Sequence, residues 1–251
     1  MAVLTDAELY ARGARTLVAS WSAYACGSRD AVVVRSAGVA SAVFRNEPAR
    51  AVYNNALLAR GLAAPERARA LDVMETAYAS AGVTRFAAWV HESDEAMRGD
   101  LEARGYIPDE ATRAMGMSLA DIRLPRPEIE LAPADWFEYL RILGVPPGLL
   151  DDVDQSAFHV LIARLGGESV ATAMAFDLDD DCGIYNVSTL EHARRRGLGT
   201  ALTALHAYEA ATRGCCTASL QSTEMAERVY AAVGFCDLGR IFEYVPSERR
   251  R

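Results

Sequence analysis

The segment 185–203 reads YNVSTLEHARRRGLGTALT, and the rest of the chain is interpreted outward from it. It begins with β-branched and aromatic residues typical of a strand and ends in alanine and leucine typical of a helix. Between them stands the pattern Arg194-x-x-Gly197-x-Gly199. Glycines expose successive backbone N–H groups in a tight turn, and a helix N-terminus adds unpaired donors and a positive dipole end. The loop therefore predicts an anion site, with a pyrophosphate as its natural ligand.

Three consecutive arginines, Arg194 to Arg196, add positive charge to this loop. A run of like charges is more often a solvated turn, but the two glycines favour the anion site. The loop is not a Walker A motif, because no Gly-Lys-Ser/Thr follows, and it is not the dinucleotide-binding G-x-G-x-x-G.

A second pattern follows after a predicted strand at Thr217 to Ser222. It reads Thr223-x-x-Ala226-x-x-Val229-Tyr230-x-x-x-Gly234-Phe235. In this order, the two patterns resemble motif A and the following motif of the GNAT superfamily of N-acetyltransferases. The resemblance covers about Ile129 to Val245 and extends more weakly over Ala31 to Leu119.

The resemblance implies that acetyl-CoA is the co-substrate and that no metal is needed. The pantetheine arm would hydrogen-bond to the strand before the loop as an added strand would. Tyr230 would protonate the leaving thiolate, because a phenol stays protonated at neutral pH, and the amine would attack directly without an acyl-enzyme. The alternative is a purely structural role, in which Tyr230 packs on the sheet. The implied cofactor-binding residues are Val187, Ser188, Thr189, Arg194, Arg195, Arg196, Gly197, Leu198, Gly199, Thr200 and Thr223.

The sequence departs from the family pattern at two places. The family has an asparagine where this chain has Thr223, so that contact with the pantetheine is weakened or made by a hydroxyl. No proline follows the strand, where Glu191-His192 stands instead. No general base is dictated by pattern, and a water-mediated route stays open. The candidate bases are Glu191, His192, Glu224, His159 and Asp177.

The chain also contains an internal repeat. Three short matches are separated by about 130 residues: Val39-Ala40-Ser41-Ala42 with Val170-Ala171-Thr172-Ala173, Tyr53-Asn54-Asn55 with Tyr185-Asn186-Val187, and Gly105-Tyr106 with Gly234-Phe235. The proline-containing stretch Arg123 to Glu130 suits a linker. The predicted fold class is α/β (α+β), with two tandem GNAT-like domains, each a mixed central sheet flanked by helices. The domains are placed at 1–122 and 130–251, with a linker at 123–129.

The first repeat lacks both chemical patterns. At the loop position it has Leu62-Ala63-Ala64-Pro65-Glu66-Arg67, without glycines and with an acidic residue that would repel phosphate. Leu101 stands at the position of Tyr230. Residues 1–122 are therefore interpreted as a degenerate domain without cofactor, which shapes a substrate cleft, hides a sheet edge or forms a dimer contact. The domain at 130–251 is interpreted as catalytic.

Periodicity and turn residues predict the elements along the chain. Helices are expected at Thr5–Tyr24, Pro65–Ser80, Asp94–Ala103, Asp135–Leu143, Gly199–Arg213 and Glu224–Val233. Strands are expected at Ala31–Arg35, Gly38–Phe44, Val52–Leu58, Thr84–His91, Ala111–Ser118, Ala157–Leu165, Ser169–Phe176, Cys182–Leu190, Thr217–Ser222 and Leu238–Val245, with a tight turn at Gly166-Gly167.

Composition limits the function further. The net charge of −8 argues against nucleic-acid binding and is compatible with a cationic substrate. The five cysteines form no C-x-x-C pair, so neither zinc nor a disulfide framework is predicted. No long apolar run or signal pattern is present, and the protein is expected to be cytoplasmic, without a membrane partner.

The predicted function is an N-acetyltransferase for a primary amine of a small molecule, an amino acid or a peptide N-terminus. A homodimer is one expected form of the protein. The alternative is a CoA-binding sensor or scaffold without turnover. A longer acyl group remains open as well.

Overall fold

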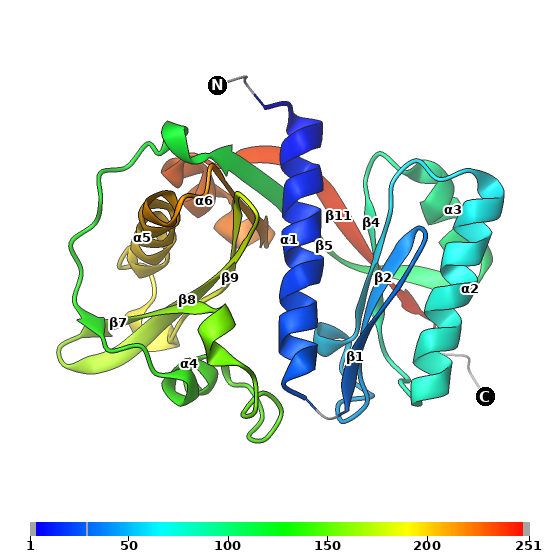
Figure 1. Ribbon diagram of the computed structural model, residues 1–251, viewed down its shortest axis with the longest axis horizontal. Coiled ribbons are helices and arrows are strands. Elements are labelled where there is room, and N and C mark those ends of the chain that lie inside the picture. Colours follow the sequence, from blue (N-terminus) through cyan, green and yellow to red (C-terminus); the bar gives the residue numbers. More distant parts are fainter. Residues whose placement is uncertain (1–3, 29, 248–251) are drawn as a thin grey trace. The chain divides into compact units, whose positions relative to one another are not determined.

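The computed structural model describes residues 4–28 and 30–247. These residues form two compact units. Unit 1 contains residues 4–20 and 113–238, and unit 2 contains residues 21–28, 30–112 and 239–247. Each unit has a mixed sheet with helices packed on it (Figure 1). The predicted fold class is confirmed.

Unit 1 is built on strands that are antiparallel except for one parallel pair, β9 with β10. The strand order is β5 (Tyr106–Ser118, from Arg113 onward), β10 (Thr217–Ser222), β9 (Asp181–Thr189), β8 (Glu168–Leu178), β7 (His159–Leu165) and β6 (Leu131–Ala132). The helices are α1 (Asp6–Cys26, up to Ser20), α4 (Trp136–Leu143), α5 (Leu198–Arg213) and α6 (Glu227–Val233).

Helix α5 packs closely on β8 and β9 because its inner face is made of small residues. Ala204, Ala207 and Ala210 are fully buried and contact the apolar side of the sheet, which includes Cys182 and Ile184 of β9. Gly214, at a φ of 101°, ends the helix in the left-handed conformation that suits glycine. The helix N-terminus is thereby held at one end of β9.

The opposite side of β9 carries Asp181, since neighbouring residues of a strand point to opposite faces. Its buried carboxylate accepts hydrogen bonds from Thr16 Oγ1 of α1 at 2.7 Å, Thr217 Oγ1 at 2.7 Å and Ser219 Oγ at 2.8 Å. A side chain at Gly13 would meet Ser219, so α1 lies close against this face. Asp181 therefore ties α1 to the start of β9 and to β10.

Unit 2 repeats the succession of elements found in unit 1. Its strand order is β1 (Ala31–Ser36), β2 (Val39–Phe44), β3 (Asn55–Leu58), β4 (Ala87–His91) and β11 (Cys236–Pro246, from Gly239 onward). Its helices are α2 (Ala64–Ala81) and α3 (Glu95–Ala103) (Figure 1). In the core of this unit, Tyr78 stacks on Phe86 with ring centroids 4.0 Å apart. As in unit 1, one pair is parallel, here β3 with β4.

The last strand of each repeat pairs in a way that the sequence did not predict. Arg113–Ser118 of β5 pairs with β10 in unit 1, and Ile241–Tyr244 of β11 pairs with β4 in unit 2. The compact units thus differ from the ranges 1–122 and 130–251 in these strands and in α1. Which open sheet edge a strand joins is a long-range choice that its own sequence does not encode.

The expected strand Val52–Leu58 is only partly correct. Ala51–Tyr53 forms a 3₁₀ turn, η1, and the strand begins at Asn55. The buried side chain of Asn54 fixes this turn, because it accepts from the amide of Phe44 at 2.8 Å and donates to the carbonyl of Glu47 at 2.9 Å. The turn at Gly166-Gly167 is present, with both glycines at positive φ.

Candidate active site

The parallel strands β9 and β10 separate after a short paired stretch. The pairs are Asp181 with Thr217, Cys182 with Ala218 and Gly183 with Ser219. Beyond Gly183, β9 stays paired with β8 as far as Thr189, and β10 stays paired with β5 as far as Ser222. One backbone edge of β9 is therefore open along residues 184–189.

A β-bulge lies within this open stretch. The register with β8 shifts between Thr172 and Met174, so that Asn186 and Val187 lie opposite the single residue Ala173. Asn186 has a φ of 55°, which asparagine tolerates better than most residues. Its amide nitrogen also donates to the hydroxyl of Tyr139 on α4 at 2.7 Å. A bulge bends its strand and increases the twist, which turns β9 away from β10.

The backbone groups of β9 divide between its two edges. The amide of Leu190 donates to the carbonyl of Val170 at 2.8 Å, which directs residue 190 toward β8. By the alternation of an antiparallel ladder, Ser188 also faces β8, whereas Val187 and Thr189 face the open edge. Of the three strand residues predicted to bind pantetheine, two have backbone groups on the free side.

The loop after β9 presents a row of unpaired amides. The 3₁₀ turn η4 (Glu191–Ala193) leads into Arg195 at a φ of 62° and Gly197 at a φ of 78°. Gly197 is the N-cap of α5 without a side-chain cap, and the first helical bond runs from the amide of Ala201 to its carbonyl at 2.9 Å. Within residues 4–28 and 30–247, the amides of 195–200 have no protein acceptor. Such consecutive donors at a helix start form an anion-binding nest.

The three arginines of this loop have different surroundings. The guanidinium of Arg194 donates through Nε to the carbonyl of Thr189 at 3.1 Å and so ties the loop to the strand end. Arg195 and Arg196 are exposed and form no ion pair with any residue that the structure describes. Two cations are thereby left for an anionic ligand.

The first turn of α5 is held in place by apolar contacts. Leu198 is buried in a cluster with Ala193 and Leu202, and Val187 packs against it. Gly199 lies close to β9, because a Cβ there would come within 3.6 Å of Val187 Cγ1. Thr200 is half-buried beside them. The loop residues and Val187 are therefore close together in unit 1.

Tyr230 lies on α6 and is 8% exposed. It belongs to the same buried cluster as Ile184 of β9 and Leu220 of β10, and its ring meets Phe235 edge-on at 6.3 Å. Burial raises the pKa of its hydroxyl to about 12, and no described residue hydrogen-bonds to that hydroxyl. A phenol in this setting stays protonated at neutral pH and can donate a proton.

Thr223 follows β10 and is exposed. Its carbonyl accepts from Ala226 N at 2.9 Å and from Ser222 Oγ at 2.8 Å. Its hydroxyl makes no cap for the turn η5 (Glu224–Ala226) that it begins. The hydroxyl is positioned at the end of β10, where the family's asparagine would stand.

The candidate bases lie in separate places, with His159 and Asp177 together in one of them. His159 is 3.4 Å from Asp177, which also receives two hydrogen bonds from Arg213 in the last turn of α5. That end of the helix is about 20 Å from the loop at its start. His192 is exposed and lies 3.3 Å from Glu168. Glu191 and Glu224 are exposed, so no candidate is buried beside Tyr230.

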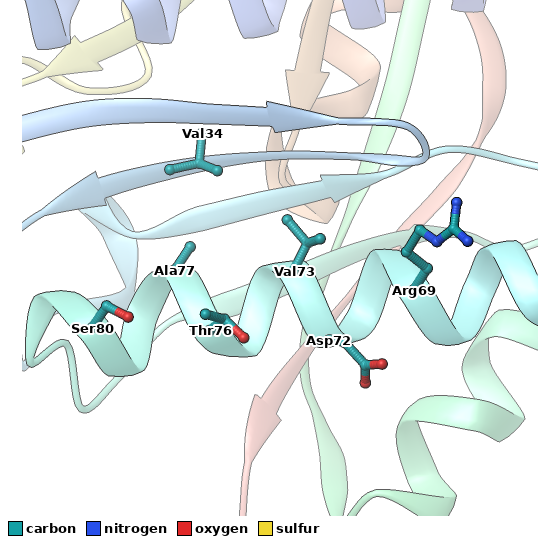
Figure 2. A pocket seen from close by; sticks show the side chains of 7 residues that line it. All are labelled: Val34, Arg69, Asp72, Val73, Thr76, Ala77 and Ser80. Carbon is teal, nitrogen blue, oxygen red and sulfur yellow. The ribbon is translucent and has the colours of Figure 1, made fainter.

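Unit 2 contains an open groove that involves none of these residues (Figure 2). Its volume is about 340 Å³, and Figure 2 shows one face of α2 turned toward the edge strand β1. The lining residues are Val34, Arg69, Asp72, Val73, Thr76, Ala77 and Ser80.

In the described part of the chain, no helix has the length and hydrophobicity needed to cross a membrane. No group of three or more His, Cys, Asp or Glu side chains there is arranged to hold a metal ion.

Three features of the site were missed by sequence reasoning. The positive φ of Asn186 had a weak signal, an asparagine inside a strand pattern, whereas that of Arg195 had none. The Asp181 cluster joins residues from three separate segments and leaves no local pattern.

The protein resembles known acetyltransferases by two comparisons. The family model described as "Acetyltransferase (GNAT) family" matches residues 119–235. Among solved structures, the GCN5-related N-acetyltransferase from Kribbella flavida is 17% identical, with a TM-score of 0.71 over 98% of this chain and 97% of that chain. The GCN5-related N-acetyltransferase from Sphaerobacter thermophilus is also 17% identical, with a TM-score of 0.60 over 83% of this chain and 76% of that one.

A tandem GNAT protein from the clavulanic acid biosynthesis pathway is 15% identical, with a TM-score of 0.55 over 87% of this chain and 83% of that chain. No curated protein matches the sequence. At these identities the structural likenesses show the fold. The resemblance drawn from the two sequence motifs is confirmed by the match of residues 119–235 to the acetyltransferase (GNAT) family model.

Proposed function

We propose that unit 1 binds acetyl-CoA and transfers its acetyl group to a primary amine. The observation that carries this proposal is the combination of an open edge on β9 with the unpaired amides of residues 195–200 at the start of α5. An edge of that kind suits an extended pantetheine arm, and the nest suits its pyrophosphate. The family match over 119–235 supports acetyl transfer as the chemistry.

Each loop residue has a distinct part in this proposal. The amides from Arg195 to Thr200 donate to the pyrophosphate, and the guanidinium groups of Arg195 and Arg196 compensate its charge. Gly197 holds the left-handed turn that aligns these amides. Arg194 acts indirectly, by tying the loop to Thr189. Val187 offers its backbone groups to the arm and Thr189 offers its amide, because the Thr189 carbonyl already accepts from Arg194. Ser188 faces β8, and the Thr223 hydroxyl takes the place of the family's amide.

Tyr230 is the proposed acid. When the amine nitrogen attacks the thioester carbonyl, the C–S bond breaks and the sulfur leaves as a thiolate, to which the Tyr230 hydroxyl gives its proton. The raised pKa keeps this proton on the phenol until the thiolate forms. The attacking amine loses its proton to water, because the candidate bases lie on exposed turns or at the far end of α5. No acyl-enzyme is needed.

Unit 2 is proposed to bind no cofactor. At the loop position before α2, the amide of Gly61 donates to the carboxylate of Asp94 at 3.1 Å, and the amide of Ala63 donates to that of Glu66 at 2.9 Å. The chain's own carboxylates thus occupy donors that a phosphate would need.

The test is a thiol-release assay with acetyl-CoA and a panel of primary amines that includes amino acids and peptide N-termini. The chain contains no lysine, so the released thiol cannot come from acetylation of a lysine side chain on the protein itself. Mass spectrometry of the acceptor identifies the acetylated product. Release that depends on an amine is expected. Saturable CoA binding without release on any amine would instead support a sensor or scaffold.

A further inference from the structure

The ring of Tyr185 is folded back along β9. Residues 181, 183 and 185 share one face of the strand. A Cβ built on Gly183 would overlap the phenol oxygen and the ring carbons Cζ and Cε2 of Tyr185. The ring therefore lies directly on the backbone of Gly183, the last residue that pairs with β10.

The hydroxyl end of Tyr185 is buried beside the Asp181 cluster. It makes no hydrogen bond of good geometry in the part of the chain that the structure describes, although the Ser219 hydroxyl is near enough to lower its pKa slightly. Burial, and after it the charge of Asp181, raises the pKa of this phenol well above its ordinary value. The cluster itself is closed, because Thr16, Thr217 and Ser219 already donate to the carboxylate. The ring's close packing on Gly183 is the main contact that fixes its position.

The position of the ring bears on where the strands separate. Continued parallel pairing in the same register would bring Tyr185 beside Gln221, with its side chain standing next to that residue. The ring leans instead toward the last pair, Gly183 with Ser219. The bulge at Asn186 follows immediately and bends β9 away.

We propose that Tyr185 is a wedge that fixes the point of separation between β9 and β10 and so positions the pantetheine arm of the co-substrate. This inference rests on the proposed function. Tyr185 acts through the strand edge and is a positioning residue. Gly183 belongs to the same device, because only glycine leaves room for the ring.

The experiment compares two ligands on the same variants by calorimetry. Acetyl-CoA uses both the loop and the open edge, whereas ADP carries a pyrophosphate but no pantetheine. Tyr185→Ala and Gly183→Ala are expected to weaken acetyl-CoA about tenfold and to leave ADP affinity within about twofold. Tyr185→Phe keeps the ring and is expected to bind both ligands like the parent protein. Tyr106→Ala, a similar truncation in the core of unit 2, serves as the control.

Each outcome has a distinct meaning. A parent protein that binds neither ligand overturns the proposed function and the wedge with it. A parent that binds both, with variants that lose both equally, overturns the wedge alone, because a general loss of structure does not separate the ligands. A Tyr185→Phe variant as weak as Tyr185→Ala also overturns it. Should Tyr185→Ala fail to fold, Tyr185→Leu and Gly183→Ala give the same comparison.

Discussion

The two units contain the same strand–loop–helix passage in two chemical states. In unit 1 the passage from β9 to α5 leaves the amides of 195–200 without acceptors among the described residues. In unit 2 the passage from β3 to α2 is shorter, and Asp94 and Glu66 accept from its amides. A helix start needs acceptors in either case. The same fold therefore leaves these donors open in one repeat and occupies them with its own carboxylates in the other.

The largest expected effect is on the nest itself. Gly197→Asp should weaken acetyl-CoA binding at least about 100-fold, or about 2.7 kcal/mol, because it strains a left-handed position and adds a charge that repels the pyrophosphate. Gly82→Asp is a matched control, since Gly82 also caps a helix in open space at a φ of 70°. Calorimetry should find its affinity unchanged. Equal affinities in both variants would place the pyrophosphate elsewhere.

The next effect concerns turnover. Tyr230→Phe removes the proposed proton donor of unit 1. The first repeat has no such donor, because Leu101 stands at the matching position. A fall in kcat of about 100-fold is expected, with KM for acetyl-CoA little changed. Tyr208→Phe, which removes a hydroxyl bound to the carbonyl of Leu124, is the control and should keep its kcat. A kcat equal to that of the parent would remove Tyr230 from the mechanism.

The units are also expected to respond oppositely to pH. In unit 1, burial lowers the pKa of His206 to about 4, so the unfolded state binds more protons and stability is lost as pH falls from 6.5 toward 4. In unit 2, burial and then the charges of Glu110 and Asp109 raise the pKa of Glu243 to about 7. The folded state then binds more protons, and stability is lost as pH rises from 4.5 through 7. Each effect is on the order of 2 kcal/mol.

Hydrogen exchange followed by mass spectrometry separates these responses by segment, with intrinsic rates corrected for pH. Amides of α5 and β8 should be better protected at pH 7 than at pH 4.5, and amides of β4 better protected at pH 5 than at pH 7.5. His206→Leu should flatten the first trend and Glu243→Gln the second. Parallel trends in both units would contradict the assignment.

The smallest effect tests whether unit 2 can be returned to the ligand-binding state. Asp94→Asn with Glu66→Gln removes both internal charges and should cost about 1 kcal/mol of unfolding free energy, mainly through the Asp94 cap on the amide of Met97. The stoichiometry should remain one CoA per chain, because the loop of unit 2 has Gly61 alone and no counterpart of Gly197-x-Gly199 at the helix start. Two CoA molecules per chain would show that the carboxylates alone exclude the ligand.

Local chemistry explains what could be predicted from the sequence. Gly197 and the alanines of α5 have their effects within a few residues, so the loop, the helix and the nest followed from the pattern. Tyr230 could be placed on a helix, but only packing gave it a shared cluster with β9 and β10. The Tyr185 ring, the Asp181 cluster and the pairing of β5 and β11 depend on partners distant in the sequence, and no short pattern records them.

The last strand of each repeat lies in the sheet of the other unit, and this affects folding during translation. The sheet of unit 2 includes Ile241–Tyr244, so that unit cannot complete its sheet on the ribosome until the chain has grown past residue 244. Unit 1 in turn draws α1 and Arg113–Ser118 from the part made first. During translation, β4 therefore lacks its β11 partner until the last part of the chain has been made. Separating the two repeats at the gene level would leave each fragment without one strand of its sheet.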